Sequence, residues 1–195
     1  EGDMLKIDTR SGDYVERVTE LVAHGISGVC IDVAHGHHAQ VGKALETIRE
    51  ICPGLHIMAG NVATLEGFDY LASRGADSIR VGIGGGSICS TRIQTGHGIP
   101  TLQSVLECSK SQYDAALIAD GGLKTSGDIV KALAAGADAV MLGSMLSGTT
   151  ETPGAVIKSA DGTTRKIYRG MASPEAQLNW RGRYSSNEGV SRTVN

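Results

Sequence analysis

The segment GGGSICSTRIQTGHG, residues 84–98, surrounds a single thiol with hydroxyls, an arginine and five glycines. Residues this small and polar do not build a core, so Cys89 stands out as a candidate nucleophile held by backbone dipoles. The plain alternative is a flexible connection between two elements. The segment is not a dinucleotide-binding fingerprint, because the GxGxxG spacing fails at Ser87 and no helix start follows at once.

A second glycine-rich segment, residues 118–144, reads IADGGLKTSGDIVKALAAGADAVMLGS. Asp120 ends an expected strand, and Ser126 is predicted to cap the helix that follows. Gly143 and Ser144 offer amides and a hydroxyl after the next strand. Loops of this kind bind phosphate in many barrel proteins, although ordinary strand-to-helix turns would have the same composition.

The segment DVAHGHH offers one carboxylate and three imidazoles, from Asp32, His35, His37 and His38. A catalytic metal would need a further ligand elsewhere, and nothing downstream supplies a matched partner. We therefore interpret Asp32, at the end of a strand, as a residue that holds a sugar hydroxyl.

The composition changes after residue 148, where the chain becomes polar and rich in turn residues. Asp161 and Gly162 predict a hairpin turn. Residues 180–195 show neither a helical nor a strand period, so we expect residues 149–195 to form a flap or tail. Arg183 and Tyr184 fall in this region; such a pair can polarise a water molecule, and a solvated tail is the alternative.

The elements that must position these residues follow a repeated order of amphipathic helix, glycine and short apolar strand. The order recurs at 15–33, 68–83 and 129–144, where Gly25, Gly75 and Gly136 are predicted to end the helices in a left-handed conformation. Strands that are apolar on both sides indicate a parallel sheet buried on both faces. We expect six of them, at 5–8, 28–33, 56–62, 77–83, 115–119 and 139–143.

Two architectures compete for this pattern, a (β/α)8 TIM barrel and a doubly wound sheet. A polar, glycine-rich loop follows nearly every strand, as a barrel active site requires, whereas a doubly wound sheet concentrates its ligand loops at one switch point. We therefore expect residues 1–195 to form a single catalytic barrel domain. A complete barrel of this type needs about eight strands, so the domain is expected to be incomplete at its N-terminus.

Composition excludes several other classes of protein. The net charge of −3 and the absence of a basic stripe argue against a nucleic-acid partner. No apolar run is long enough to span a membrane. The four cysteines form no CxxC pair, which argues against structural zinc and favours a reducing, cytoplasmic setting. Cys30, Cys52 and Cys108 are expected to be ordinary packing residues.

Four segments, taken in order, resemble the inosine monophosphate (IMP) dehydrogenase and guanosine monophosphate (GMP) reductase family: GGGSICSTR, IADGG, DIVKALAAGADAVMLGSMLSGTTETPG and YRGM. The resemblance runs from about Thr9 to Val190. It implies a (β/α)8 barrel that commonly assembles as a homotetramer, with residues 5–8 as the third barrel strand and 139–143 as the eighth.

The resemblance also implies a reaction and a role for each residue. Cys89 would attack C2 of IMP, a hydride would pass to NAD, and water would release xanthosine monophosphate (XMP), with Thr91 beside the nucleophile. The implied nucleotide site comprises Ser87, Asp120, Gly122, Gly143, Ser144, Tyr168, Gly170, Met171 and Glu188. Within it, Asp120 would grip the ribose diol, while Met171 and Glu188 would face the base. Asp32 and Asn61 would lie near the nicotinamide, Arg183 and Tyr184 would activate water, and the carbonyls of Gly84, Gly86 and Cys89 would hold potassium.

The resemblance favours the dehydrogenase over the reductase. The segments GSMLSGTTETPG and YRGM, together with the position of Arg183 and Tyr184, are closer to the dehydrogenase. The segment TLQSVLEC is closer to the reductase, and only three residues separate Tyr184 from Glu188, fewer than in a dehydrogenase flap. A barrel that binds purine nucleotides without turnover and a flavin-dependent barrel are two further alternatives.

Overall fold

The computed structural model describes residues 4–7, 14–170, 173, 178 and 191–194. Six parallel strands form one sheet in which each strand pairs with the next along the chain, in the order β1-β2-β3-β4-β5-β6. The strands are β1 (Met4–Ile7), β2 (Gly28–Asp32), β3 (His56–Val62), β4 (Ser78–Val81), β5 (Ala116–Asp120) and β6 (Ala139–Met141). All six strands predicted from the sequence are confirmed, with ends that differ by at most a few residues.

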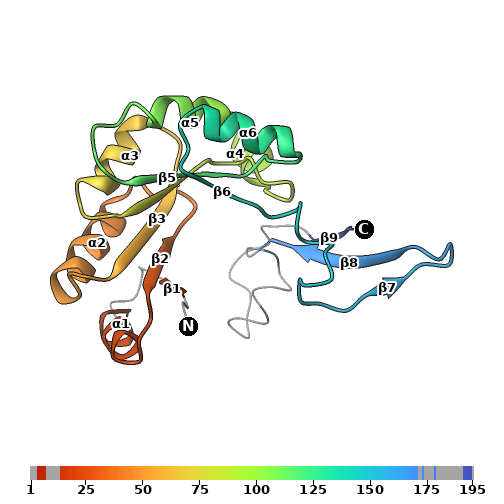
Figure 1. Ribbon diagram of the computed structural model, residues 1–195, viewed down its shortest axis with the longest axis horizontal. Helices are drawn as coiled ribbons and strands as arrows, with labels where there is room; N and C mark the ends of the chain where they lie inside the picture. The colour runs from red at the N-terminus through yellow and green to blue at the C-terminus, as the bar shows by residue number, and fades with distance from the viewer. Residues whose placement is uncertain (1–3, 8–13, 171–172, 174–177, 179–190, 195) are drawn as a thin grey trace.

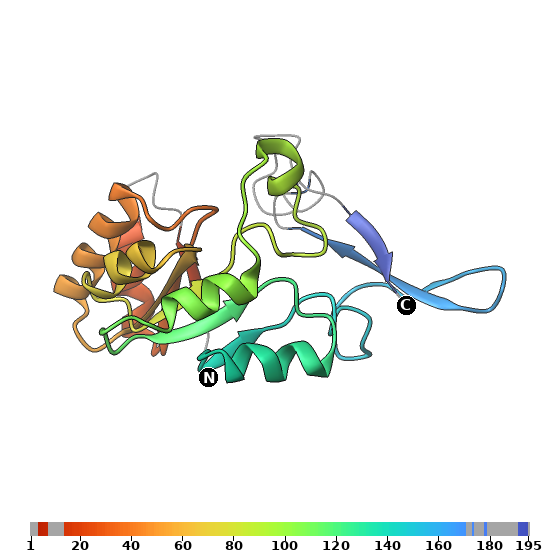
Figure 2. The same ribbon diagram turned by 90° about the horizontal axis from the view of Figure 1, so that it is seen from above.

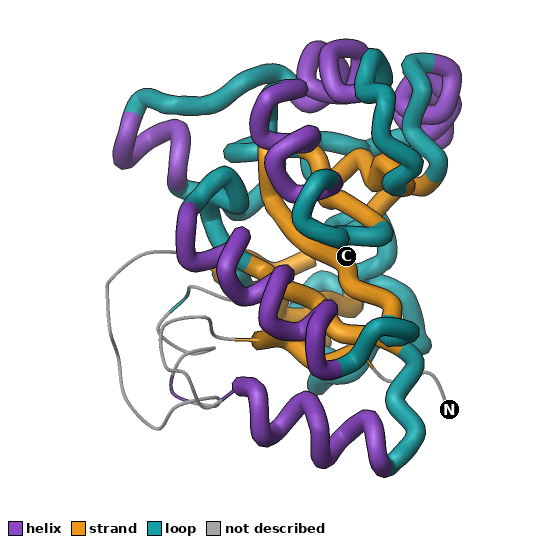
Figure 3. Tube along the Cα trace, turned by 90° about the vertical axis from the view of Figure 1, so that its left-hand side faces the viewer, coloured by secondary structure: helices purple, strands orange, loops and turns teal. Residues whose placement is uncertain are grey.

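Helices connect the strands and, apart from the short helix in the loop after β4, lie along the outer side of the curved row that the strands form (Figure 1). Figure 3 shows the same row of strands from the side, with the helices packed around it. The helices are α1 (Tyr14–Ala23), α2 (Ala39–Ile51), α3 (Leu65–Ala72), α4 (Thr91–Thr95), α5 (Thr101–Cys108) and α6 (Ser126–Ala134). Sequential parallel strands with helices on one side of the curve are the arrangement of a (β/α) barrel. The fold is therefore part of a TIM barrel, as the loop pattern predicted.

The core lies between the sheet and its helices. The helical residues Phe68 and Leu71 of α3 pack there with Ile57 and Ile79 of the neighbouring strands, and each is 1% exposed or less. All four residues of β4 are buried. Burial on both faces of a strand is expected where helices cover one face of a parallel sheet and barrel-facing side chains fill the other.

Glycine ends three of the helices, as predicted. Gly25, Gly75 and Gly136 have φ angles of +84°, +94° and +107°, in the region that side chains disfavour. The predicted N-cap of α6 is wrong by one residue: Thr125 caps the helix in place of Ser126. Thr125 and Asp128 form a capping box, and the extended backbone of Thr125 is what allows its hydroxyl to reach the Asp128 amide at 3.2 Å.

The sequence Gly-Ala-Asp precedes both β4 and β6, and its aspartate makes the same two bonds each time. Asp77 donates its amide to the Ile57 carbonyl at 2.9 Å and accepts from the Ile57 amide through its carboxylate at 2.7 Å. Asp138 repeats both bonds with Leu117, at 2.9 and 2.7 Å. Each aspartate thus fixes the start of its strand against the strand before it.

A second, smaller sheet follows the parallel one. It contains β7 (Ile157–Lys158), β8 (Thr164–Arg169) and β9 (Ser191–Val194), all antiparallel, in the order β7-β8-β9. The β7–β8 hairpin extends away from the parallel sheet (Figures 1 and 2). It turns at Gly162, which has φ +84°, so the predicted Asp-Gly hairpin is confirmed.

The prediction that residues 180–195 contain no strand was wrong for β9. A strand this short pairs with β8 through backbone hydrogen bonds, which require no alternation of apolar side chains for a pattern to detect. Among the described helices, none has the length and apolar character needed to cross a membrane.

Candidate active site

The carboxyl ends of the parallel strands meet along one edge of the sheet, where (β/α) barrels place their active sites. Asp32 ends β2, Asn61 lies near the end of β3 and Asp120 ends β5. The glycine-rich segments singled out in the sequence follow β4, β5 and β6 at the same edge. The topology therefore gathers these segments into one region of the molecule.

Asn61 ties the ends of three neighbouring strands together. Its Nδ2 donates to the Asp120 carboxylate at 2.8 Å and to the Gly82 carbonyl at 2.7 Å. Gly82 has φ +141°, and a Cβ there would lie 2.0 Å from the Asp120 carbonyl oxygen, so a side chain is excluded. The orientation of the Asp120 carboxylate is consequently set by the protein itself.

Asp32 forms an ion pair with Arg80, a residue that sequence reasoning did not single out. The Arg80 side chain is 9% exposed and its Nη1 lies 3.7 Å from Met141 Sδ in β6. A charged side chain buried this deeply is stable only with a partner of opposite charge. An arginine between the apolar residues Ile79 and Val81 of this strand was the signal that could have revealed the pair.

Cys89 lies in the loop between β4 and α4 and is half-buried. Its amide donates to the Gly86 carbonyl at 3.1 Å, which closes a turn, and its Sγ lies 3.3 Å from Thr91 Oγ1. The structure thus brings together the two residues that sequence analysis placed beside each other in the reaction. A partly exposed thiol in contact with a hydroxyl is accessible to a ligand at this edge of the sheet.

Cys108 shows the opposite environment. Burial, with smaller contributions from Asp69 and Glu107, raises the pKa of the Cys108 thiol to about 12. This thiol stays protonated, and a protonated thiol is a poor nucleophile. Cys52 is also buried in the core, which confirms that both are packing residues, whereas Cys30 is half-buried in β2.

The loops after β4 and β5 touch through their backbones. A Cβ on Gly85 would lie 2.6 Å from Thr101 Oγ1 and 3.1 Å from the Gly121 carbonyl carbon. A Cβ on Gly121, whose φ is +87°, would lie 3.0 Å from the Gly86 amide nitrogen. The loop that carries Cys89 therefore rests directly on the loop that follows Asp120.

Tyr168 of β8 reaches back to the loop after β6. Its hydroxyl lies 2.7 Å from the position that a Cβ on Gly143 would take. The predicted phosphate-binding residues Gly143 and Tyr168, which are 25 positions apart in the sequence, are thus brought together. Ser144 is next to Gly143, and its carbonyl accepts a hydrogen bond from Ser147 Oγ at 2.9 Å.

Comparison with known proteins agrees with this geometry. A family profile described as "IMP dehydrogenase / GMP reductase domain" matches residues 7–195. The chain belongs to the IMP dehydrogenase and GMP reductase family. Inosine-5'-monophosphate dehydrogenase from Nitrosopumilus maritimus is 44% identical over 91% of this chain and 37% of its own length. The enzyme of that name from Aquifex aeolicus is 49% identical over 83% of this chain and 33% of its own length. The chain therefore spans about a third of these curated relatives.

Two solved structures of the family are similar to this one. GMP reductase from Trypanosoma brucei, crystallised as a variant in complex with guanosine 5'-monophosphate, superposes with a TM-score of 0.90 at 40% identity. The match covers 99% of this chain and 41% of that one. Inosine 5' monophosphate dehydrogenase from Legionella pneumophila gives a TM-score of 0.82 at 49% identity, covering 100% and 60% of the two chains.

Three other residues that the family resemblance singled out lie in the loops after β4 and β5 and at the end of β8. Ser87 lies between Gly86 and Cys89 in the same loop, and Gly122 follows Gly121 after β5. Gly170 comes directly after β8, and its carbonyl accepts from the Ser173 amide at 3.0 Å. Four of the predicted site residues, Met171, Arg183, Tyr184 and Glu188, lie outside the described residues.

The histidines that follow β2 are occupied with local contacts. His38 Nδ1 accepts from the Gln40 amide at 3.2 Å and so caps α2. His37 packs against the Tyr70 ring with centroids 4.7 Å apart. Within the described part of the chain, no three histidines, cysteines or carboxylates are grouped as a metal site would require.

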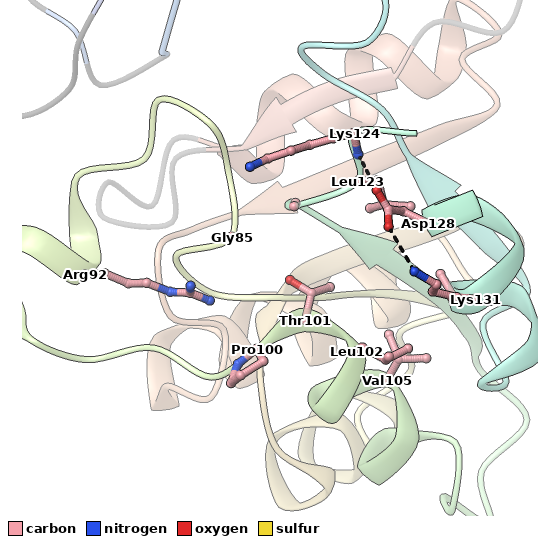
Figure 4. A pocket seen from close by; sticks show the side chains of 13 residues that line it. Gly85, Arg92, Pro100, Thr101, Leu102, Val105, Leu123, Lys124, Asp128 and Lys131 are labelled. Carbon is pink, nitrogen blue, oxygen red and sulfur yellow. Dashed lines mark hydrogen bonds and ion pairs between the residues drawn. The ribbon is translucent and has the colours of Figure 1, made fainter. Parts of the chain in front are cut away.

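A cavity of about 390 Å³ lies between α5 and α6, behind the glycine loops (Figure 4). Its floor is apolar, with Val105 and Leu123, and Arg92 and Lys124 extend over it from opposite sides. Of the predicted nucleotide residues that the structure describes, Gly122 alone lines it. Gly85 and Gly121 also line it, so the cavity adjoins the loops that follow β4 and β5.

Proposed function

We propose that this protein is the catalytic part of an IMP dehydrogenase, which oxidises IMP to XMP while NAD is reduced, a step in guanine nucleotide biosynthesis. The observation that carries the proposal is Cys89, half-buried on a glycine-rich loop, with its Sγ 3.3 Å from the Thr91 hydroxyl. Relatives named inosine-5'-monophosphate dehydrogenase that are 44% and 49% identical support it.

The chemistry assigned to Cys89 is covalent. The thiolate would add to C2 of the purine, and the hydride on C2 would pass to NAD as the two-electron acceptor, which would leave a thioimidate on Cys89. Water then adds to C2 and the sulfur leaves, so XMP and the free thiol are produced. The backbone turn from Gly86 to Cys89 brings the sulfur to the loop surface, and Thr91 orients it.

Nucleotide binding is assigned to the edge of the sheet on both sides of this loop. Asp120, held by Asn61, accepts two hydrogen bonds from the ribose diol. Ser87, Gly122, Gly143, Ser144 and Tyr168 surround the 5'-phosphate, with Gly170, Met171 and Glu188 completing the nucleotide site. Amides and hydroxyls suit this task because they donate hydrogen bonds to the phosphate oxygens.

The residues present also fit the two groups that the reaction needs. NAD supplies a hydride acceptor when bound. Asn61 Nδ2 donates to Asp120 and Gly82, so the side-chain oxygen of Asn61 is the atom that would accept a hydrogen bond from a ribose hydroxyl. Arg80 holds Asp32, at the end of the neighbouring strand, through their ion pair. Arg183 and Tyr184 would activate the hydrolytic water.

For potassium, the donors are the carbonyls of Gly84, Gly86 and Cys89. Gly84 has φ +79°, and the Gly86 carbonyl already accepts from the Cys89 amide. A carbonyl oxygen has a second lone pair, so this turn can bind a weakly hydrated cation as well. We also expect the whole enzyme to be a cytoplasmic homotetramer.

GMP reductase is the second candidate, and the TM-score of 0.90 with the trypanosomal reductase favours it. The two enzymes differ in the fate of the covalent adduct. One spectrophotometric assay separates them: a dehydrogenase forms NADH from IMP and NAD and is accelerated by potassium. A reductase consumes NADPH with GMP and releases ammonia.

The decisive variant is Cys89→Ala in the full-length protein, with Cys108→Ala as the matched control thiol. We expect Cys89→Ala to lower kcat by at least about a thousandfold. The folded Cys108→Ala variant should keep its turnover. Mass spectrometry of the wild type during turnover should detect a nucleotide adduct on Cys89. Normal turnover by Cys89→Ala would refute both assignments, as IMP dehydrogenase and as GMP reductase. Tight IMP binding without reaction under either cofactor would favour a nucleotide sensor.

A further inference from the structure

Lys166 is a buried cation in a strand that is otherwise mostly exposed. The residue is 7% exposed, while Ile167 beside it is 60% exposed. Its Nζ donates to the Thr149 carbonyl at 2.6 Å, the Thr152 carbonyl at 2.6 Å and the Thr152 hydroxyl at 3.3 Å. An ammonium has three hydrogens, so these acceptors use all of its donor capacity.

The segment that Lys166 holds is continuous with the loop after β6. Thr152 Oγ1 lies 3.0 Å from the Ser147 carbonyl, and Ser147 Oγ donates to the Ser144 carbonyl at 2.9 Å. The Leu146 amide donates to the Gly143 carbonyl at 3.1 Å. These hydrogen bonds link the segment held by Lys166 to the carbonyls of Gly143 and Ser144, two of the residues assigned to the phosphate.

The same strand face makes a second contact with this loop. Lys166 and Tyr168 are two positions apart in β8, so their side chains lie on one face of the strand. Tyr168 places its hydroxyl beside Gly143, at the start of the loop, while Lys166 holds Thr149 and Thr152 near its end. Two side chains of one strand thus fix the loop at both ends.

We propose that Lys166 is a positioning residue for the 5'-phosphate site: its ammonium fixes the segment 143–152 so that the Gly143 amide, the Ser144 hydroxyl and the Tyr168 hydroxyl converge. The proposal rests on the proposed function only in assigning a purine 5'-monophosphate to this site. Lys166 does not touch the nucleotide. Its effect should therefore appear in the recognition of the phosphate and not in the chemistry at Cys89.

The test compares Lys166→Met with the control Lys158→Met in the full-length protein. Lys158 is an exposed lysine of β7 in the same small sheet, so the control removes the same charge without touching the segment. Binding of IMP and of inosine, which lacks the phosphate, is measured by calorimetry. We expect Lys166→Met to weaken IMP binding by about tenfold to a hundredfold and inosine binding by less than about twofold. Lys158→Met should change neither.

A second variant keeps the test decisive if Lys166→Met does not fold. Thr152→Val keeps the volume but removes the hydroxyl between Lys166 and Ser147, and we expect it to weaken IMP binding by about threefold to tenfold, again without affecting inosine. Equal losses for nucleotide and nucleoside, or no loss for either, would overturn the proposal. Because both assays measure binding alone, they can succeed even if Cys89→Ala shows the assigned chemistry to be wrong.

Discussion

The two sheets of this protein are stabilised in different ways. In the parallel sheet, Ile79 and Val81 of β4 are completely buried. In the small antiparallel sheet, Ile157 is 41% and Ile167 is 60% exposed, and the buried side chain of β8 is a lysine. The parallel sheet is therefore stabilised by its apolar core, whereas the small sheet is held to the segment after β6 by the hydrogen bonds of Lys166 and by the close approach of Tyr168 to Gly143.

This difference predicts which kind of substitution matters in each sheet. The parallel sheet supplies a stable edge on which Asp120, Asn61 and the Cys89 loop are held. The small sheet contributes contacts to one loop, the segment 143–152, and the isoleucines of β7 and β8 are exposed. Substitutions of apolar residues should therefore matter in the first region and substitutions of polar anchors in the second.

The largest effect is expected at Phe68, which is 1% exposed between α3 and the sheet. Phe68→Ala should lower the free energy of unfolding by about 3–5 kcal/mol, because it leaves a cavity in a close-packed core. Chemical denaturation followed by far-UV circular dichroism measures it. A loss below about 1 kcal/mol would mean that the parallel sheet does not depend on this core.

Asp77 tests the strand-start bonds. Asp77→Ala should cost about 2–3 kcal/mol, since it leaves the Ile57 amide without its acceptor and removes the partner of Arg49 Nη2, 2.6 Å away. Asp138→Ala is the matched control, because Asp138 makes the same amide bond with Leu117 but forms no ion pair with an arginine of the described residues. Its cost should be smaller, about 1 kcal/mol. Equal costs would show that the arginine pairing is energetically neutral.

Thr125 tests the cap of α6 and its pH dependence. Thr125→Ala should cost about 1 kcal/mol near neutral pH. Hydrogen bonds from the Lys124 amide and from Thr125 lower the pKa of Asp128 below its ordinary value of 3.8. A carboxylate with a lowered pKa stabilises the folded state above that value and loses this contribution as the pH falls through the lowered pKa. The difference in free energy of unfolding between wild type and Thr125→Ala should therefore become smaller below about pH 4. A difference that does not change with pH would contradict the capping box.

The smallest effect is expected at Ile167, on the exposed face of β8. Ile167→Ala should change the free energy of unfolding by less than about 0.5 kcal/mol, because the side chain buries little surface. Together with Phe68→Ala it gives a direct contrast between the two sheets. A cost above about 1 kcal/mol would show that a partner covers this face in the whole protein.

The sequence predicted the parallel sheet well because its signals are local. Apolar runs such as ALIA at 116–119, the glycines that end helices and the polar residues after strands are each recognised from a few neighbouring positions. The same signals placed Asp120 and Gly143 at the correct edge. The side-chain contact between Asn61 and Asp120 could not be predicted, because it depends on how three strands align.

What the sequence could not show is which polar residues become buried. Lys166 lies in a polar run, TTRKIYR, which reads as a solvated strand, and its burial follows only from the packing of β8 on the loop after β6. Arg80 is a different case, because an arginine between Ile79 and Val81 was a signal that the sequence did offer. The short strand β9 was missed because its pairing partner, rather than its own composition, determines its structure.

The contact between the loops that follow β4 and β5 also constrains how this protein can change. With only hydrogen atoms between Gly85 and Gly121, any substitution at one position displaces the other. Neither loop can then be reshaped one residue at a time, and a redesign of this part of the fold would have to exchange both loops together.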